Sequence, residues 1–337
     1  MRILLQLPNW LGDAVMATPA LNNCLHHFRG SEFTLIGSPV VADLFADDRR
    51  FGAVYADTTK KTRFRMGGLW KLGRKLRKER GPFDLAISWQ NNAAARWLMW
   101  SAGAVERVSR RKHPVADLLL THAVACEPQQ HHACIHNEVL NGFLGTDYVC
   151  GKTTLPSLGR HQYARPTVGL HPGAAYGSAK RWEPQRFAEA AVRLAQRYDI
   201  ALFGAPHEKE ITAAIESQLQ TAGVTNVTNF TGQTTVRELA ARIAGLELFI
   251  ANDSGPMHVA GALNTPTIAV FGSTDHTQTK PWAAELCSVV RLDLECSPCH
   301  ARHCPLGHHK CMADLTADHV LAAADALLAR RSLAAAG

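Results

Sequence analysis

Short runs of apolar residues alternate along the chain with longer segments that repeat apolar residues at helical spacing. The short runs have the length and composition of buried strands, and the longer segments have the period of amphipathic helices. Strands are predicted at 2–7, 33–37, 53–56, 85–89, 107–109, 167–171, 200–204, 227–230, 248–251 and 267–272. Alternation of strand and helix predicts an α/β protein with parallel sheets.

The helices expected between these strands include 13–28, 184–198, 207–221, 235–245 and a terminal helix at 316–333. Around 150–166 the alternation lapses into a sequence rich in Gly, Pro and Thr, which is typical of a linker. A chain of 337 residues is also long for a single core. The sequence therefore predicts two tandem domains, 1–160 and 161–315, followed by a terminal segment, 316–337.

Three polar loops that follow predicted strands carry the candidate chemistry: PNWLGDAV (8–15), HPGAAYGSAKRW (171–182) and NDSGPMH (252–258). Asp13 is placed either to cap the first helix or to act as a general base. Small residues in the second loop allow close approach to a ligand, and Lys180 adds positive charge. In the third loop, Asp253 or Ser254 either caps the next helix or leaves its N-terminus to bind a phosphate. Together, the loops favour a nucleotide or diphosphate ligand.

Positive charge is concentrated in one segment. The formal net charge is +7, and the stretch from Lys60 to Arg80 holds ten Lys or Arg residues and one acid. Such a run is either a solvated helix face or a site for an anionic partner: nucleic acid, a phosphorylated glycolipid or an anionic membrane surface. The sequence has no transmembrane-length apolar run and no convincing signal peptide, so a cytoplasmic location is expected.

Four cysteines near the C-terminus form the pattern C-x2-C-x4-C-x6-C. This spacing resembles that of tetrahedral zinc ligands, and a structural zinc ion is therefore predicted. A reduced structural loop, disulfides formed on oxidation and an iron–sulfur site are the alternatives. The four residues are Cys296, Cys299, Cys304 and Cys311.

Four motifs make the chain similar to the heptosyltransferases of glycosyltransferase family 9. They are LPNWLGDAVMATPAL (7–21), LHPGAAYGSAKRWEPQRFAEA (170–190), NFTGQTTVRELAARI (229–243) and NDSGPMHVAGALNTPTIAVFGSTD (252–275). The resemblance implies a GT-B fold, in which the parallel sheets of two Rossmann-like domains face an interdomain cleft. The first domain would bind the acceptor and the second, with its Cys-rich segment 296–311, the nucleotide sugar. The terminal helix would cross back to the first domain.

The resemblance also implies roles for individual residues. Asp13 would be the catalytic base. The donor-binding residues would be Lys180, Thr231, Gly232, Asp253, Ser254, Gly255, Pro256 and His258, although His258 could equally serve helix packing or capping. Independently of the resemblance, the positive charge of the basic run suits an anionic acceptor, and the predicted acceptor-binding residues are Lys60, Lys61, Arg63 and Arg65.

The implied reaction is inverting transfer of heptose from ADP-heptose to the phosphorylated inner core of lipopolysaccharide, in its heptosyl-Kdo region. The enzyme would work at the cytoplasmic face of the inner membrane, in peripheral contact with anionic lipid. No Asp-x-Asp pair occurs in the sequence, so no metal cofactor is expected for catalysis. A nucleic-acid partner is not expected either. The alternatives are a family 9 heptosyltransferase acting on another core sugar, a GT-B nucleotide-sugar epimerase, and a nucleic-acid-binding protein with a zinc knuckle.

Overall fold

The computed structural model describes residues 1–112 and 114–336. The chain divides into two compact units, Met1–Ser157 and Leu158–Gly337. The division lies close to the boundary predicted at residue 160.

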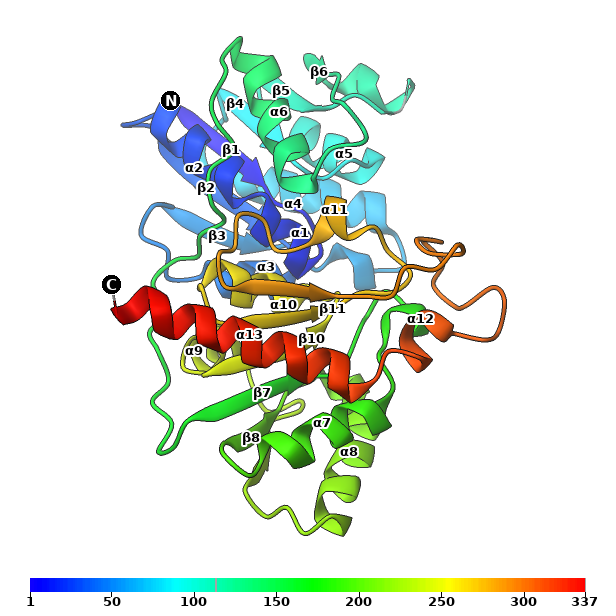
Figure 1. Ribbon diagram of the computed structural model, residues 1–337. Helices are drawn as coiled ribbons and strands as arrows, with labels where there is room; N and C mark the ends of the chain where they lie inside the picture. The colour runs from blue at the N-terminus through cyan, green and yellow to red at the C-terminus, as the bar shows by residue number, and fades with distance from the viewer. Residues whose placement is uncertain (113, 337) are drawn as a thin grey trace. The chain divides into compact units, whose positions relative to one another are not determined.

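The first unit contains a six-stranded parallel sheet in the order β3-β2-β1-β4-β5-β6 (Figure 1). Its strands are β1 (Arg2–Gln6), β2 (Glu32–Gly37), β3 (Ala53–Ala56), β4 (Leu85–Ser88), β5 (Glu106–Arg110) and β6 (His122–Val124). Its helices are α1 (Leu11–Met16), α2 (Thr18–His27), α3 (Pro39–Leu44), α4 (Arg65–Arg80), α5 (Ala93–Ser101) and α6 (His132–Leu144). The helices α4 and α5 pack on one face of the sheet, where Leu69, Leu76 and Leu98 join its core.

The second unit repeats this arrangement, with the order β12-β11-β10-β7-β8-β9. Its strands are β7 (Thr167–His171), β8 (Asp199–Leu202), β9 (Val227–Asn229), β10 (Leu248–Asn252), β11 (Thr267–Val270) and β12 (Cys287–Val290). Its helices are α7 (Pro184–Leu194), α8 (Lys209–Thr221), α9 (Val236–Ala244), α10 (Gly255–Ala262), α11 (His276–Thr279), α12 (Lys310–Ala313) and α13 (Ala317–Ala336).

The helix α13 packs against α7, β11 and β12 of its own unit (Figure 1). Val320, Ala324 and Leu327 enter the same core as the strands. The expected crossing of this helix to the first domain stays a prediction. None of the helices in residues 1–112 and 114–336 is long and apolar enough to cross a bilayer.

Counted within its own unit, each sheet has the strand order 3-2-1-4-5-6. Successive strands are added first toward one edge of the sheet and then toward the other. The change occurs between the neighbouring first and fourth strands, which are β1 and β4 in one unit and β7 and β10 in the other. Ligands of such sheets bind beyond the carboxyl ends of the strands at this switch point. The predicted pair of Rossmann-like domains is therefore confirmed.

Three local predictions differ from the structure. The helix expected at 13–28 is broken at Ala17 into α1 and α2, and Pro19 stands in the first turn of α2, where its missing N–H is tolerated. The short edge strands β6 and β12 were not predicted. Edge strands are paired on one side only, so their sequences need not show a long apolar run.

Candidate active site

Asn252, at the end of β10, fastens the loop that follows β7. Its side chain is fully buried. Its amide donates to the carbonyl of Pro172 at 2.7 Å, and its Oδ1 accepts from the backbone N–H of Trp182 at 3.0 Å. Both ends of the loop are thereby tied to the switch point. Asn252 lies within one of the motifs, but no local sequence pattern indicates this role.

Lys180 and Asp253 are paired at the same strand ends. Lys180 Nζ lies 2.5 Å from Asp253 Oδ2, and the side chains are 13% and 5% exposed. Thr274 donates a hydrogen bond to the same Oδ2 at 2.6 Å. Lys180 Nζ also lies 4.9 Å from the ring centroid of Tyr176. The two residues predicted separately for donor binding thus form one unit, with the ammonium group held in place by the carboxylate.

The helix α10 begins at this pair. Ser254 is its N-cap residue, but the side chain makes no capping hydrogen bond. Instead, Ser254 Oγ lies 3.3 Å from His171 Nδ1. Gly255 and Pro256 follow in the first helical turn. The capping interpretation of Ser254 is therefore wrong, and the positive end of the α10 dipole lies close to the Lys180–Asp253 pair without a side-chain cap.

His171 lies at the end of β7 and is buried against Glu208. The distance from His171 Nε2 to Glu208 Oε2 is 3.7 Å. Burial lowers the pKa of His171, and the charge of Glu208 opposes this shift. Gly173 packs so closely on this carboxylate that a Cβ there would lie 2.0 Å from Glu208 Oε1. A side chain at residue 173 would therefore displace the Glu208 carboxylate from its place beside His171.

The remaining predicted donor residues lie at the end of β9 and in α10. Thr231 is buried, and its Oγ1 has no hydrogen-bond partner among the described residues. A buried hydroxyl without a partner is costly, so a ligand group that bonds to it would be stabilised. Gly232 has a φ of 69°, which favours glycine. His258 is buried within α10.

In the first unit, Asp13 lies in the first turn of α1, which follows β1 after a short loop. Trp10 is the N-cap, and no side chain caps the helix. Asp13 is therefore not the cap. Its Oδ1 lies 3.7 Å from His132 Nδ1, and its side chain is 35% exposed. Nearby, burial lowers the pKa of His136 to about 4, against the opposing charge of Asp13. An accessible carboxylate at this strand end fits proton transfer.

Polar side chains fix the loop between β1 and α1. Asn9 Nδ2 donates to Gln90 Oε1 at 2.9 Å, and Gln90 Nε2 donates to the carbonyl of Leu7 at 2.8 Å. Ser38 Oγ donates to the carbonyl of Asn9 at 2.8 Å. The ends of β1, β2 and β4 are thus joined around the loop that leads to Asp13.

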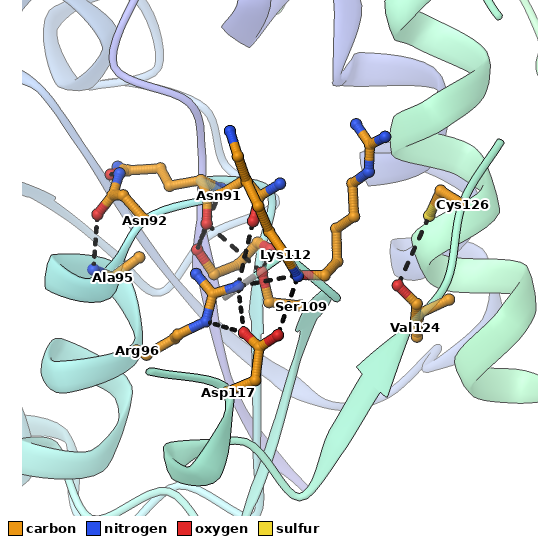
Figure 2. Close-up of polar contacts among 12 residues, drawn as sticks. Asn91, Asn92, Ala95, Arg96, Ser109, Lys112, Asp117, Val124 and Cys126 are labelled. Carbon is orange, nitrogen blue, oxygen red and sulfur yellow. Dashed lines mark hydrogen bonds and ion pairs between the residues drawn. The ribbon is translucent and has the colours of Figure 1, made fainter. Parts of the chain in front are cut away.

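Beyond β4 and β5, the buried side chain of Arg96 organises the chain that follows β5. Figure 2 shows the guanidinium of Arg96 directed at Asp117, with Nε 2.6 Å from Oδ1. Arg96 also donates to Asn91 Oδ1 at 3.1 Å and to the carbonyl of Arg110 at 2.9 Å. The other carboxylate oxygen of Asp117 accepts from the N–H of Lys112 at 2.9 Å. This network holds the turn after β5.

The predicted acceptor residues lie where a 3-10 helix (Thr59–Lys61) leads into α4. Lys60, Lys61 and Arg63 are exposed, and Arg65 is the first residue of α4. On α4 itself, Trp70 remains 42% exposed among cations, and Arg74 lies over its ring. The basic run is thus a solvent-facing surface that includes aromatic side chains.

The four cysteines of the predicted zinc site line one cavity of about 20 Å³. They lie between β12 and α13, and all are free thiols. Within residues 1–112 and 114–336, no group of three or more His, Cys, Asp or Glu side chains is arranged to hold a metal ion. The prediction of structural zinc at Cys296, Cys299, Cys304 and Cys311 is therefore unsupported, because proximity without ligand geometry is not a metal site.

Comparison with known proteins agrees with the fold and the motifs. The family model of glycosyltransferase family 9 (heptosyltransferase) matches residues 69–310. Lipooligosaccharide heptosyltransferase 2 of Campylobacter jejuni is 34% identical over 330 residues, which cover 95% of this chain and 97% of that protein. The structure of Escherichia coli ADP-heptose lipopolysaccharide heptosyltransferase II covers 98% of this chain and 100% of its own, with a TM-score of 0.82 and 23% identity. An Escherichia coli heptosyltransferase with ADP-2-deoxy-2-fluoro heptose has a TM-score of 0.73 and 20% identity, and the match covers 96% and 98% of the two chains.

Two doubly wound units of this kind define the GT-B fold class. Within that class, the chain belongs to glycosyltransferase family 9, the heptosyltransferases. It is therefore an enzyme. The family membership favours an enzyme over the nucleic-acid-binding alternative.

Proposed function

We propose that this enzyme transfers heptose from ADP-heptose to the inner core of lipopolysaccharide, as a heptosyltransferase II. The relatives named lipooligosaccharide heptosyltransferase 2 and ADP-heptose lipopolysaccharide heptosyltransferase II support this substrate pair. The observation that carries the proposal is the Lys180–Asp253 pair beside the uncapped start of α10. It offers a fixed cation and a helix dipole to a diphosphate at the switch point of the second sheet.

In the proposed mechanism, the acceptor hydroxyl attacks the anomeric carbon of the donor as its bond to the ADP oxygen breaks. Attack from the face opposite ADP inverts the configuration at that carbon. Asp13 accepts the hydroxyl proton. The departing diphosphate gains negative charge, which Lys180 and the backbone amides of Ser254 and Gly255 stabilise. No metal is needed in this scheme, since the protein supplies the positive charge.

Asp253 has two tasks in this proposal. Its Oδ2 fixes Lys180 and accepts from Thr274. A carboxylate repels a diphosphate, so the other carboxylate oxygen of Asp253, Oδ1, faces hydroxyls of the sugar or ribose. Thr231 and Gly232 lie next to the nucleotide, where the unpartnered hydroxyl of Thr231 finds a hydrogen bond.

We also propose that the acceptor is phosphorylated and that the enzyme contacts the cytoplasmic face of an anionic membrane through α4. Lys60, Lys61, Arg63 and Arg65 provide positive charge for the acceptor phosphates. Farther along α4, the exposed ring of Trp70 lies among cations. Trp100 of α5, which is 46% exposed, lines the same surface. Cations attract an anionic surface, and tryptophan rings settle at the membrane–water interface.

The direct test is incubation with ADP-heptose and a truncated inner-core acceptor, with the product identified by mass spectrometry and the anomeric configuration by NMR. An inverted heptoside is expected. Epimerised nucleotide sugar formed without acceptor would favour the epimerase alternative instead, and transfer to a different core sugar would identify another member of the family.

A further inference from the structure

The loop that carries Lys180 rests on the cysteine-rich segment. Tyr176 donates its hydroxyl hydrogen to the carbonyl of His300 at 2.9 Å. The backbone N–H of Ala179 donates to the carbonyl of Arg302 at 3.0 Å. Ser178 Oγ lies 2.9 Å from His303 Nδ1. Three successive contacts therefore support the short turn that ends at Lys180.

The fit between the two segments is close. A Cβ at Gly177 would lie 2.2 Å from the carbonyl oxygen of Arg302, so the absence of a side chain at Gly177 is what lets the loop lie this close to the segment. The segment is also tied to the end of β11. His300 donates its N–H to the carbonyl of Ser273 at 2.7 Å, and Ser297 Oγ donates to the carbonyl of Gly272 at 2.5 Å. A shift of the segment would therefore reach the donor site.

The four thiols lie immediately behind this contact. They line one cavity of about 20 Å³ together with Ala179 of the loop and Ser273. A space of this size holds about one water molecule. Cys304 Sγ accepts a hydrogen bond from the N–H of His309 at 3.3 Å, an environment that favours the nucleophilic thiolate. All four thiols line the same cavity, and this proximity is the first requirement for a disulfide.

We propose that Cys296, Cys299, Cys304 and Cys311 form a reversible thiol–disulfide switch that controls the Lys180 loop and thereby donor binding. The effect on donor binding rests on the proposed function of that loop. A disulfide would bring two of the cavity-lining sulfur atoms to bonding distance, and the chain that carries them would shift. The carbonyls of His300 and Arg302, which lie between the cysteines, would move with them.

The oxidant in this proposal is a peroxide. The Cys304 thiolate attacks one peroxide oxygen, the O–O bond breaks, and the sulfur becomes a sulfenic acid while hydroxide leaves and takes up a proton as water. A neighbouring thiol of the set then attacks that sulfur, loses its proton, and expels the oxygen as a second water. Two thiols are oxidised to one disulfide and one peroxide is reduced. A dithiol reductant reverses the bond by exchange.

The test uses the full-length protein, reduced and then exposed to hydrogen peroxide. Thiol titration in denaturant should fall by two from the nine cysteines of the chain, and peptide mass spectrometry should place the disulfide within 296–311. ADP affinity, measured by calorimetry, should fall by roughly tenfold, because small displacements of a positioning group have large effects. Dithiothreitol should restore it. Cys304→Ser should make ADP affinity insensitive to peroxide, whereas Cys126→Ser, outside the set, should leave the response intact.

Amide hydrogen exchange over 172–182 provides a readout that needs no ligand. It should rise on oxidation. A disulfide that changes neither exchange nor ADP affinity would overturn the switch, as would a stoichiometric metal ion in the reduced protein as purified. Increased exchange in a protein whose reduced form does not bind ADP would refute the proposed function and leave the coupling of thiols to the loop standing.

Discussion

Lys180 Nζ and Asp253 Oδ2 lie 2.5 Å apart, across the carboxyl ends of β7 and β10. The pair joins two motifs that are far apart in the sequence and places a cation beside the start of α10. Both side chains are largely buried, so neither charge is fully hydrated. Each charge is therefore stabilised mainly by the other.

Replacement of Lys180 by Met should reduce ADP-heptose affinity and also destabilise the fold. The loss of stability should be about 2 kcal/mol or more, since it leaves a buried carboxylate without its cation. The double variant Lys180→Met/Asp253→Asn should recover part of the stability but not the affinity. Calorimetry and urea unfolding measure the two effects, with Arg197→Met as an exposed control. Unchanged donor affinity in Lys180→Met would remove this residue from the proposed site.

Replacement of Asp13 by Asn should reduce transfer by roughly a thousandfold, because the amide cannot accept the proton of the acceptor hydroxyl. ADP binding should stay at the wild-type level. Rates of heptose transfer and ADP titration test this, with Asp47→Asn as an exposed control on the same unit. A folded Asp13→Asn enzyme that transfers heptose at a near-normal rate would exclude Asp13 as the base.

The stability of the protein should decrease as the pH falls from about 6.5 to about 4. Burial lowers the pKa of His136 to about 4 in the folded protein. The unfolded chain therefore binds this proton at a higher pH than the folded chain, and protonation favours unfolding throughout that window. The loss of stability due to His136 should approach about 3 kcal/mol near pH 4, and it should not increase further at lower pH.

Urea unfolding at several pH values, compared between wild type and His136→Gln, isolates this contribution. The variant should show a shallower dependence on pH, whereas His26→Gln, at an exposed position, should follow the wild type. Parallel pH profiles for His136→Gln and wild type would contradict the prediction.

Replacement of Arg96 by Met should cost about 3 kcal/mol of stability or more, because Asp117 then keeps a mostly buried charge without its partner. The carbonyl of Arg110 also loses a donor. Urea denaturation measures the cost, and Arg49→Met is the exposed control. A loss no larger than that of the control would mean that the network in Figure 2 contributes little to folding.

The surface of α4 should bind vesicles that contain phosphatidylglycerol more strongly than vesicles of phosphatidylcholine alone. The binding should weaken as salt is added, because exposed charges are screened. Trp70→Ala/Trp100→Ala should reduce it by roughly tenfold through lost interfacial burial. Cosedimentation tests this, with Leu333→Ser as a control at another exposed apolar position. Equal binding to both vesicle types would refute the proposed membrane contact.

Much of the candidate site could be predicted, because its motifs follow strands whose apolar runs are local signals. Asp13, Lys180 and Asp253 were all assigned from such loops. The partner of each could not be assigned in this way. Two pairs join residues that are far apart in the sequence: Lys180 with Asp253, and Asp13 with His132. Sequence spacing also suggested a zinc site where the described residues show four thiols without metal-ligand geometry.

By itself, the sequence determined the parallel α/β architecture, the division into two units and the loops that carry polar chemistry. Apolar periodicity and turn residues act over a few positions, so they can be read directly. Only the tertiary structure decided which loops meet at each switch point, because this depends on strand order. It brought Asn252 against the loop after β7 and set the cysteine-rich segment behind Lys180. Such contacts arise from close packing between distant segments, which no local pattern records.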